Sequence, residues 1–222
     1  MGEKQTGDRP VRQTHRSARE RREQLLDAAV EVVSGRGVKG LTTRAVTEQA
    51  GVPHGVFHYT FGSKQELFSA LLEREVSSTL ASVADAMRAC SDVATALQAA
   101  LTAQLHLVQR NPDYHLALNE LSLAHQRVDA AASLSEWEQR QYRARTCADL
   151  QAWSLERGLT WTVDLEDLAA YLVALGAGVA TTWLADRDDR SARSAIAVAA
   201  QAVSALAVVG AHRDGRPATA GS

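Results

Sequence analysis

Helical periodicity runs through almost the whole chain and limits the possible folds more than any other feature. Apolar residues recur three and four positions apart from residue 25 onward, first in Leu25, Leu26, Ala29, Val32 and Val33. This spacing is typical of a helix with one buried face. We find no alternating apolar and polar runs between turn residues, which would indicate strands. The sequence therefore predicts an all-α protein without strands.

Glycines and capping residues divide the pattern into about nine helices. Gly35 and Gly37 are expected to end the first helix, because glycine adopts left-handed backbone easily. The second helix would start at Thr42 or Thr43 and stop at Gly51, and a short third would cover residues 53–59. The remaining helices are expected from a capping box at Ser63 and Glu66, over residues 92–109, from residue 113, from a second capping box at Ser133 and Glu136 to Arg157, from Asp164 to Ala185, and from Asp189 or Ser191 to Val209.

Composition favours a globular protein of a reducing compartment. The chain is 45% hydrophobic and 23% charged, an ordinary balance, and we count no apolar run of the roughly 18 to 20 residues that a membrane span needs. The two cysteines, Cys90 and Cys147, are far apart in the sequence. This argues against a disulfide framework and predicts a cytoplasmic location.

Charge is divided unevenly along the chain. Residues 1–64 hold 11 Lys and Arg against 7 Asp and Glu, whereas residues 65–222 hold 13 against 19. The net charge of −2 by itself argues against a nucleic-acid binder. A basic N-terminal part before an acidic remainder is, however, typical of a DNA-reading domain attached to another domain.

The segment between residues 42 and 59 has the layout of a helix-turn-helix, two short helices joined by a glycine-containing turn. Gly51 stands at the turn, and Val46 and Phe57 are among the residues placed to form a small core. Residues 41–72, LTTRAVTEQAGVPHGVFHYTFGSKQELFSALL, resemble the DNA-binding region of the TetR/AcrR family of transcriptional regulators. The matching positions include Leu41, Thr42, Thr43, Ala50, Gly51, Val52, Gly55, Phe61, Ser63, Lys64, Gln65, Glu66 and Leu67.

The resemblance implies a layout of four parts. A flexible basic arm would occupy residues 1–15 and a helix-turn-helix DNA-binding domain residues 16–64. A helical ligand-binding and dimerisation domain would occupy residues 65–211, and a flexible tail residues 212–222.

The resemblance also implies which residues meet DNA, with the third helix in the major groove. Gly55 would let the backbone approach the DNA closely, and Tyr59 and Lys64 would contact phosphates. Thr43 and Arg44 would reach a phosphate or a base edge. The full set is Thr43, Arg44, His54, Gly55, Val56, His58, Tyr59 and Lys64.

Three positions depart from the family pattern. Pro53 stands where the family often has Ser or Thr, and His54 and His58 stand at its usual Lys-like and Tyr-like positions. Because histidine is mostly neutral near pH 7, this recognition helix is less cationic than many. The N-terminal arginines could compensate by reaching toward the minor groove or flanking phosphates, or they could form a solvated tail. They are Arg9, Arg12, Arg16, Arg19, Arg21 and Arg22.

The last two expected helices are rich in small residues, which permit close helix packing. These are Ala174, Gly176, Ala177, Gly178 and Ala180, then Ala195, Ala197, Ala199, Ala200, Ala202 and Ala205. An intramolecular bundle and a four-helix dimer interface would both use them. The resemblance favours a homodimer, whose two DNA-binding domains would bind a palindromic operator.

The resemblance further implies a small-molecule effector that releases a repressor from its operator. Nine residues of the middle helices are candidates to line its pocket, although for any one of them core packing or a local hydrogen bond is the commoner role. They are Met87, His106, Asn119, His125, Trp137, Tyr142, Trp153, Tyr171 and Trp183. Four Trp among only 5% aromatics favour an apolar or aromatic effector. A regulator controlled by a protein partner is the alternative, and the sequence does not separate repressor from activator.

An enzyme is the least favoured class. Residues 35–40 match G-x-G-x-x-G by letters but follow a helix rather than a strand, so we expect no dinucleotide cofactor. Metal-binding and nucleophile motifs are missing from the sequence, so we expect neither a metal site nor catalysis. An all-helical enzyme with an incidental helix-turn-helix remains a distant alternative.

Overall fold

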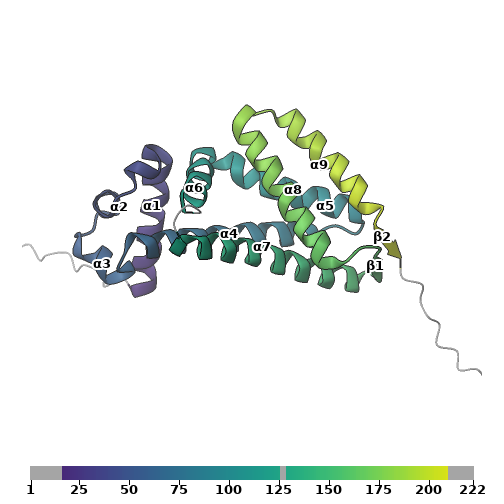
Figure 1. Cartoon of the computed structure of the whole chain (residues 1–222), viewed down its shortest axis with the longest axis horizontal. Coiled ribbons are helices and arrows are strands. Elements are labelled where there is room, and N and C mark those ends of the chain that lie inside the picture. Colours follow the sequence, from purple (N-terminus) through teal and green to yellow (C-terminus); the bar gives the residue numbers. More distant parts are fainter. Residues whose placement is uncertain (1–16, 126–128, 210–222) are drawn as a thin grey trace, which may run out of the picture.

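The structure, a computed structural model, describes residues 17–125 and 129–209 (Figure 1). The basic arm expected at residues 1–15 and the tail expected at residues 212–222 lie outside these residues. The described part contains nine helices and two short strands: α1 (Ala18–Gly40), α2 (Thr43–Gln49), α3 (Gly55–Phe61), α4 (Lys64–Arg88), α5 (Val93–Arg110), α6 (Pro112–His125), α7 (Asp129–Glu156), β1 (Leu159–Trp161), α8 (Leu165–Asp186), α9 (Asp189–Ser204) and β2 (Ala207–Val209).

Helices α1 to α3 form a small unit at one end of the molecule, here called the head (Figure 1). The Ser17 hydroxyl accepts from the Glu20 amide at the start of α1, while the Glu20 carboxylate accepts from the Ser17 amide. Thr42 caps α2 through the Ala45 amide. Leu25, Val46 and Phe57 are fully buried between the three helices. This apolar contact fixes the angle between two helices too short to be stable alone.

The remaining helices form the body, in which α4 and α7 run side by side along the long axis (Figure 1). Helix α5 packs on α4, and α8 and α9 cover the other side of α5. Asp92, Asp164 and Asp188 start α5, α8 and α9, each accepting backbone amides at its helix end. A carboxylate at this position satisfies amides that lack an intrahelical partner.

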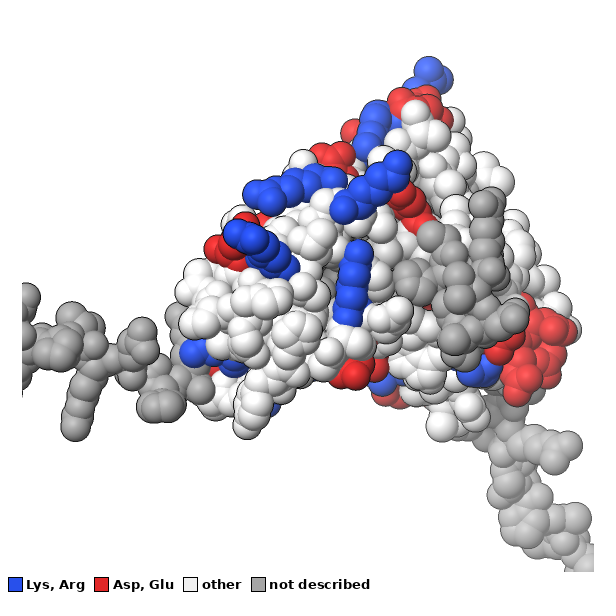
Figure 2. Space-filling model, turned by 60° about the vertical axis from the view of Figure 1, so that its left-hand side comes forward, with Lys and Arg blue, Asp and Glu red and all other residues white. Residues whose placement is uncertain are grey.

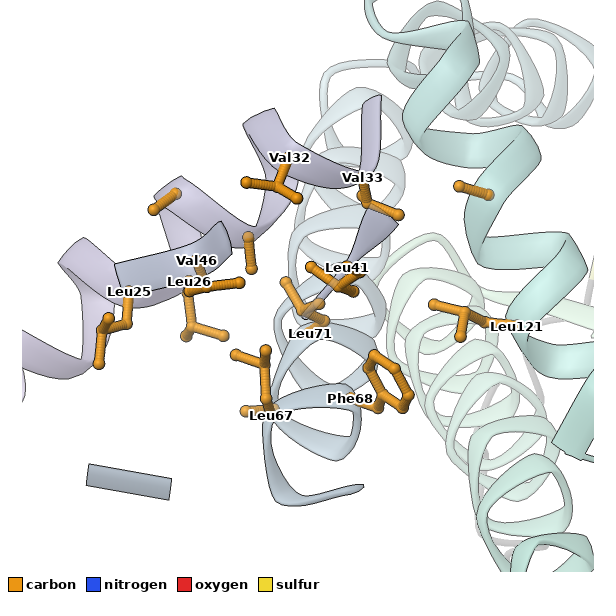
Figure 3. Packing of buried hydrophobic residues seen from close by; sticks show 14 of the residues in the cluster. Leu25, Leu26, Val32, Val33, Leu41, Val46, Leu67, Phe68, Leu71 and Leu121 are labelled. Atoms are coloured by element: carbon orange, nitrogen blue, oxygen red, sulfur yellow. The ribbon is translucent and has the colours of Figure 1, made fainter. Parts of the chain in front are cut away.

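The hydrophobic core of the head continues into the body. Helix α6 packs against α1 and also contacts α5 and α7. Its Tyr114, Leu118 and Leu121 belong to the same buried cluster as the head residues and Phe68 of α4. Figure 3 shows Leu121 directed toward Phe68 of α4. A rigid apolar contact of this kind lets a movement of α4 or α6 reach α1 directly.

A two-stranded antiparallel sheet corrects the expectation of a chain without strands. β1 pairs with β2, with Thr160 opposite Val208. Each strand has three residues. A strand of this length is too short to show a recognisable alternating pattern in the sequence. The pairing ends α9 at Ser204, so the helix expected to reach Val209 stops earlier.

Two other helix boundaries differ from expectation. Helix α7 is already formed at Asp129, so Ser133 lies inside it and the second capping box is wrong. Helical geometry breaks at Gly37, as the glycines predict, with φ of 64°. One further turn follows this break, so α1 extends to Gly40.

Candidate nucleic-acid interface and effector cavity

The recognition helix α3 is held by its buried face and presents the other face to solvent. Phe57 and Phe61 are buried, and the Arg22 guanidinium lies 4.9 Å from the Phe61 ring centre. Gly51, with φ of 63°, makes the turn before α3, and the Gln24 side-chain amide donates to the Ala50 carbonyl at 2.8 Å. The turn is therefore tied to α1, which fixes the orientation of α3.

The exposed face of α3 carries most of the residues expected to meet DNA. The Tyr59 side chain is 90% exposed, and His54, Gly55 and His58 are exposed beside it. A Cβ on Gly55 would meet no protein atom within 4 Å, so the fold does not require glycine there. Val56 is half-buried against the head core, which leaves it less available than the sequence implied.

Three further expected contacts lie at helix starts. Thr43 is the first residue of α2, and the exposed Arg44 beside it pairs with Glu48 at 2.8 Å. An exposed ion pair contributes little, so Arg44 can exchange Glu48 for a phosphate at low cost. Lys64 opens α4, with its ammonium 5.1 Å from the Phe68 ring centre. The first-turn amides of α4 lie at the same helix end as this lysine, and such a helix end attracts anions.

The charge on this side of the molecule is dispersed rather than concentrated. Figure 2 shows separate Lys and Arg side chains, acidic groups beside some of them and a broad surface without charge. The α3 sequence, GVFHYTF, contains no Lys or Arg. Electrostatic attraction to DNA must therefore come from residues around α3, whereas α3 itself offers hydrogen-bonding and aromatic groups.

The body contains a cavity of two adjoining chambers. The apolar chamber, of about 70 Å³, lies between α4, α5, α7 and α8 and is lined by residues that include Val83, Met87 and Leu150. The acidic chamber, of about 180 Å³, extends toward α6 and is lined by Glu75, His115 and Glu138 among others. Thr79, Gln104, Tyr142 and Val173 line both chambers.

Burial governs the ionisation of groups around the acidic chamber. The pKa of Glu138 is raised by burial and then by the nearby Glu75 carboxylate, while a hydrogen bond from Ser122 acts the other way. Burial lowers the pKa of His115 in spite of the attraction of Glu75, whose carboxylate lies 3.8 Å away. His115 is therefore neutral near pH 7. Burial and the charge of Glu75 raise the pKa of Tyr142, which stays a neutral hydroxyl.

The structure brings three of the nine expected effector residues to the cavity. Met87 lines the apolar chamber, Asn119 lines the acidic chamber and Tyr142 lines both. Three others lie away from it: His106 is exposed, Tyr171 is 49% exposed, and Trp137 is half-buried elsewhere on α7. The side chain of His125 lies outside the described residues.

The two remaining candidates, Trp153 and Trp183, have structural partners. Trp153 is buried in the core between α4, α5, α7 and α8 and donates to the Met87 carbonyl at 3.0 Å. Trp183 donates to Asp189 at 2.7 Å and so joins the end of α8 to the start of α9. A buried indole with a satisfied N–H is typical of core packing.

Sequence reasoning missed the ionisable residues Glu75, His115 and Glu138 of the acidic chamber. Glu75 and Thr79 are four residues apart on α4, as are Glu138 and Tyr142 on α7, so each pair lies on one helix face. In α4 the pair interrupts the apolar face that contains Leu72 and Val76. A charged residue at a core position is the signal that could have found the chamber.

Comparison with known proteins identifies the head. Residues 25–71 match the family model described as bacterial regulatory proteins of the tetR family. The head is therefore a TetR-family DNA-binding domain. The match spans α1 to α3 and the first turns of α4, which are the elements that position the exposed face described above.

Relatives extend the similarity into the body. The chain is 26% identical over 164 residues to the nucleoid occlusion factor SlmA of Haemophilus influenzae, covering 73% of this chain and 75% of that protein. It is 36% identical over 92 residues to the transcriptional activator FasR of Mycolicibacterium smegmatis, covering 41% of this chain and 42% of that protein. Together with the family model, the similarity to FasR supports a DNA-binding transcriptional regulator.

Solved structures share the whole fold. A regulator from Rhodococcus sp. assigned to the TetR family superposes with a TM-score of 0.70 at 22% identity, covering 83% of this chain and 98% of that one. The multidrug-binding protein EbrR, solved in complex with imidazole, gives a TM-score of 0.62 at 23% identity, covering 87% and 96%. Similarity at this level of identity establishes the TetR fold for the body as well as the head.

Helix α4 connects the cavity of the body to the TetR-like head. Glu75 faces the acidic chamber, whereas the preceding residue, Arg74, faces α1. Arg74 pairs with Asp27 at 2.7 Å and with Glu23 at 3.7 Å. Successive residues of one helix thus contact the cavity and the head, so a shift of α4 at the cavity would alter the ion pairs that hold α1.

Proposed function

We propose that this regulator is a dimeric repressor that binds a palindromic operator through α3 and is released by a small-molecule effector bound in the body cavity. The observation that supports DNA binding through α3 is its exposed face. On this face Tyr59 is 90% exposed, whereas the nearby Phe57 is buried. An exposed tyrosine offers a partner both an apolar ring and a hydrogen-bonding hydroxyl, which is why tyrosine is enriched at interfaces. Thr43, Arg44 and Lys64 would flank it with phosphate contacts, and such a regulator would act in the cytoplasm.

The dimer is supported by the surface of α8 and α9. Helix α8 is long and apolar enough to cross a membrane by length and composition, yet only 39% of its apolar window is buried within the chain. Its exposed residues include Ala174, Gly178 and Thr182, and α9 exposes Ala195 and Val198 next to them. Small side chains permit close approach of helices from a second copy. We therefore assign this surface to a homodimer rather than to a membrane.

The dimer can be tested with one substitution. Val198 is 68% exposed on α9, so Val198→Arg should leave the fold intact and place a charge in the interface. We expect light scattering to show a monomer and operator affinity to fall. Leu155→Arg, at an 80% exposed position on α7, is the matched control. A Val198→Arg protein that remains a dimer with full operator affinity would exclude this interface.

Release by an effector is supported by the cavity and by the contacts of α4. A ligand that prefers one setting of α4 shifts the protein toward that setting, and with it the position of the head. Footprinting of the DNA beside its own gene, with and without cavity ligands, tests the proposal. An effector that fills the cavity yet leaves the footprint unchanged would contradict it.

A second candidate is a DNA-bound factor controlled by a protein partner instead of a small molecule. The similarity to SlmA over 164 residues favours it, because that relative is named for nucleoid occlusion rather than for a response to a ligand. Titration of small molecules, followed by Trp fluorescence, discriminates between the two. The first candidate requires a saturable change that depends on cavity residues.

A further inference from the structure

The cavity of the body carries negative charge without a cationic side chain to balance it. Glu75, Glu138 and Asp149 line its two chambers. Among the lining residues of the described chain there is no Lys or Arg. Asp149 is paired with Arg145 at 3.1 Å. Within this described lining, no Lys or Arg pairs with Glu75 or Glu138. The neutral His115 does not compensate them.

The two glutamates differ in how well the protein satisfies them. Glu75 accepts from the Thr79 hydroxyl at 3.1 Å and has Tyr114 and His115 beside it. Glu138 is half-buried, and Ser122 supplies its one side-chain hydrogen bond among the causes of its pKa shift. Both burial and the neighbouring Glu75 disfavour its charge. A carboxylate in this environment is stabilised by any cation that enters the chamber.

The apolar chamber indicates that such a cation should also have an apolar part. Its lining is dominated by aliphatic side chains, including Leu80, Val83 and Leu172, and it joins the acidic chamber at Tyr142. The Tyr142 ring borders both spaces and can also face a cation. The cavity therefore combines an acidic end with an apolar end, as an amphipathic ligand requires.

We propose that the effector is an organic cation, with its charged group between Glu75 and Glu138 and its apolar body in the chamber beside Met87. The inference rests on the proposed effector role of the cavity and adds the chemical class of the ligand. A metal ion fits less well, because within residues 17–125 and 129–209 no three His, Cys, Asp or Glu side chains gather closely enough to bind one. A bare ion would also leave the apolar chamber unfilled.

Three ligands of equal length and different charge test the class. Octylamine, 1-octanol and octanoate share one alkyl chain and differ in the charge of the head group. Their affinities are measured by calorimetry on the full chain. We expect octylamine to bind at least about tenfold more tightly than octanol, because a hydrogen bond between two charged groups is stronger than one made by a neutral hydroxyl. Octanoate should bind most weakly.

Two substitutions on α7 assign the effect to the chamber. Glu138→Gln should reduce octylamine affinity by about tenfold or more while leaving octanol affinity unchanged. Glu136→Gln is the matched control, because Glu136 lies two residues away, exposed and paired with Arg140. Thermal unfolding should show Glu138→Gln no less stable than the wild type, since the substitution removes a buried charge. Glu75→Gln gives a second variant, in which the Thr79 hydroxyl still has an acceptor.

Four results would overturn the inference. Octanol or octanoate could bind as tightly as octylamine, Glu136→Gln could weaken octylamine as much as Glu138→Gln, Glu138→Gln could leave octylamine affinity unchanged, or none of the three ligands could bind. Operator affinity measured in parallel separates this failure from that of the proposed function. A neutral or anionic ligand that releases the operator would leave the effector-controlled regulator standing and refute only the cationic class.

Discussion

Replacing Tyr59 by alanine should weaken operator binding and leave the stability of the fold unchanged. Tyr59 and Phe57 are two residues apart on α3, yet the side chain of Tyr59 is 90% exposed and that of Phe57 fully buried. Phe57 packs in the core of the head, whereas the ring of Tyr59 extends into solvent. The same helix thus offers one aromatic residue for the fold and one for the partner.

The expected magnitudes follow from these exposures. Loss of an exposed side chain changes the free energy of unfolding by at most about 0.5 kcal/mol, so the urea midpoint of Tyr59→Ala should match that of the wild type. A lost DNA contact costs about 1 to 3 kcal/mol, or roughly 5- to 150-fold in Kd for one head. Phe57→Ala, which empties a buried aromatic site, should instead cost about 3 to 5 kcal/mol of stability.

Fluorescence anisotropy on an operator selected in vitro by the wild-type protein measures the affinity at fixed salt. Urea unfolding followed by circular dichroism measures the stability of the same samples. Leu155→Ala is the control, since it removes an exposed side chain from α7 in the body. Less than a twofold loss of affinity in Tyr59→Ala, or an equal loss in Leu155→Ala, would refute the assignment of α3 as the recognition helix.

Three further outcomes are expected. Gly55→Ala should keep or raise stability, because its Cβ meets no protein atom and alanine favours helix by up to about 1 kcal/mol; operator affinity should fall, and full affinity in the anisotropy assay would exclude close backbone approach. Gly176→Ala should also leave the melting temperature almost unchanged, since its Cβ would meet the far end of the flexible Gln104 side chain. The new methyl group would push the Gln104 side chain into the cavity, so octylamine should bind more weakly. An unchanged octylamine affinity in calorimetry would contradict this. Burial lowers the pKa of His115 from its ordinary 6.5, so the neutral form is favoured in the folded state, and the stability it contributes above pH 6.5 is lost as the pH falls below that value. Between pH 7 and 5, urea unfolding of His115→Asn should show a smaller loss of stability than the wild type, and equal losses would argue against a buried neutral imidazole.

The sequence predicted the head well because its signals are local. The capping residues Thr42 and Ser63 act within one turn of themselves, and both cap their helices as expected. Gly51 marks the turn before α3 by its own backbone conformation. The periodicity of Val46 and Phe57 predicted their burial. Each of these features depends on residues at most a few positions apart, so a short stretch of sequence is enough to predict it.

The cavity could not be predicted in the same way, because it depends on residues distant in the sequence. Glu75 and Glu138 belong to α4 and α7, and the packing of these helices brings them to one chamber. Composition suggested that tryptophans would line the pocket. Trp153 instead lies in the core and donates a hydrogen bond to the Met87 carbonyl. The role of a buried side chain depends on what packs against it, and no local pattern states this.

By itself, the sequence determined the order of the helices and the helix-turn-helix, since periodicity and capping act between near neighbours. The face of α3 that meets DNA was implied by the resemblance to the TetR/AcrR family. Tertiary structure decided three other features. It paired the two three-residue strands β1 and β2, it joined α6 to the core of the head, and it left two glutamates facing one cavity. Each of these requires contact between segments far apart in the chain, where the gain from packing selects one arrangement among many that the local signals allow.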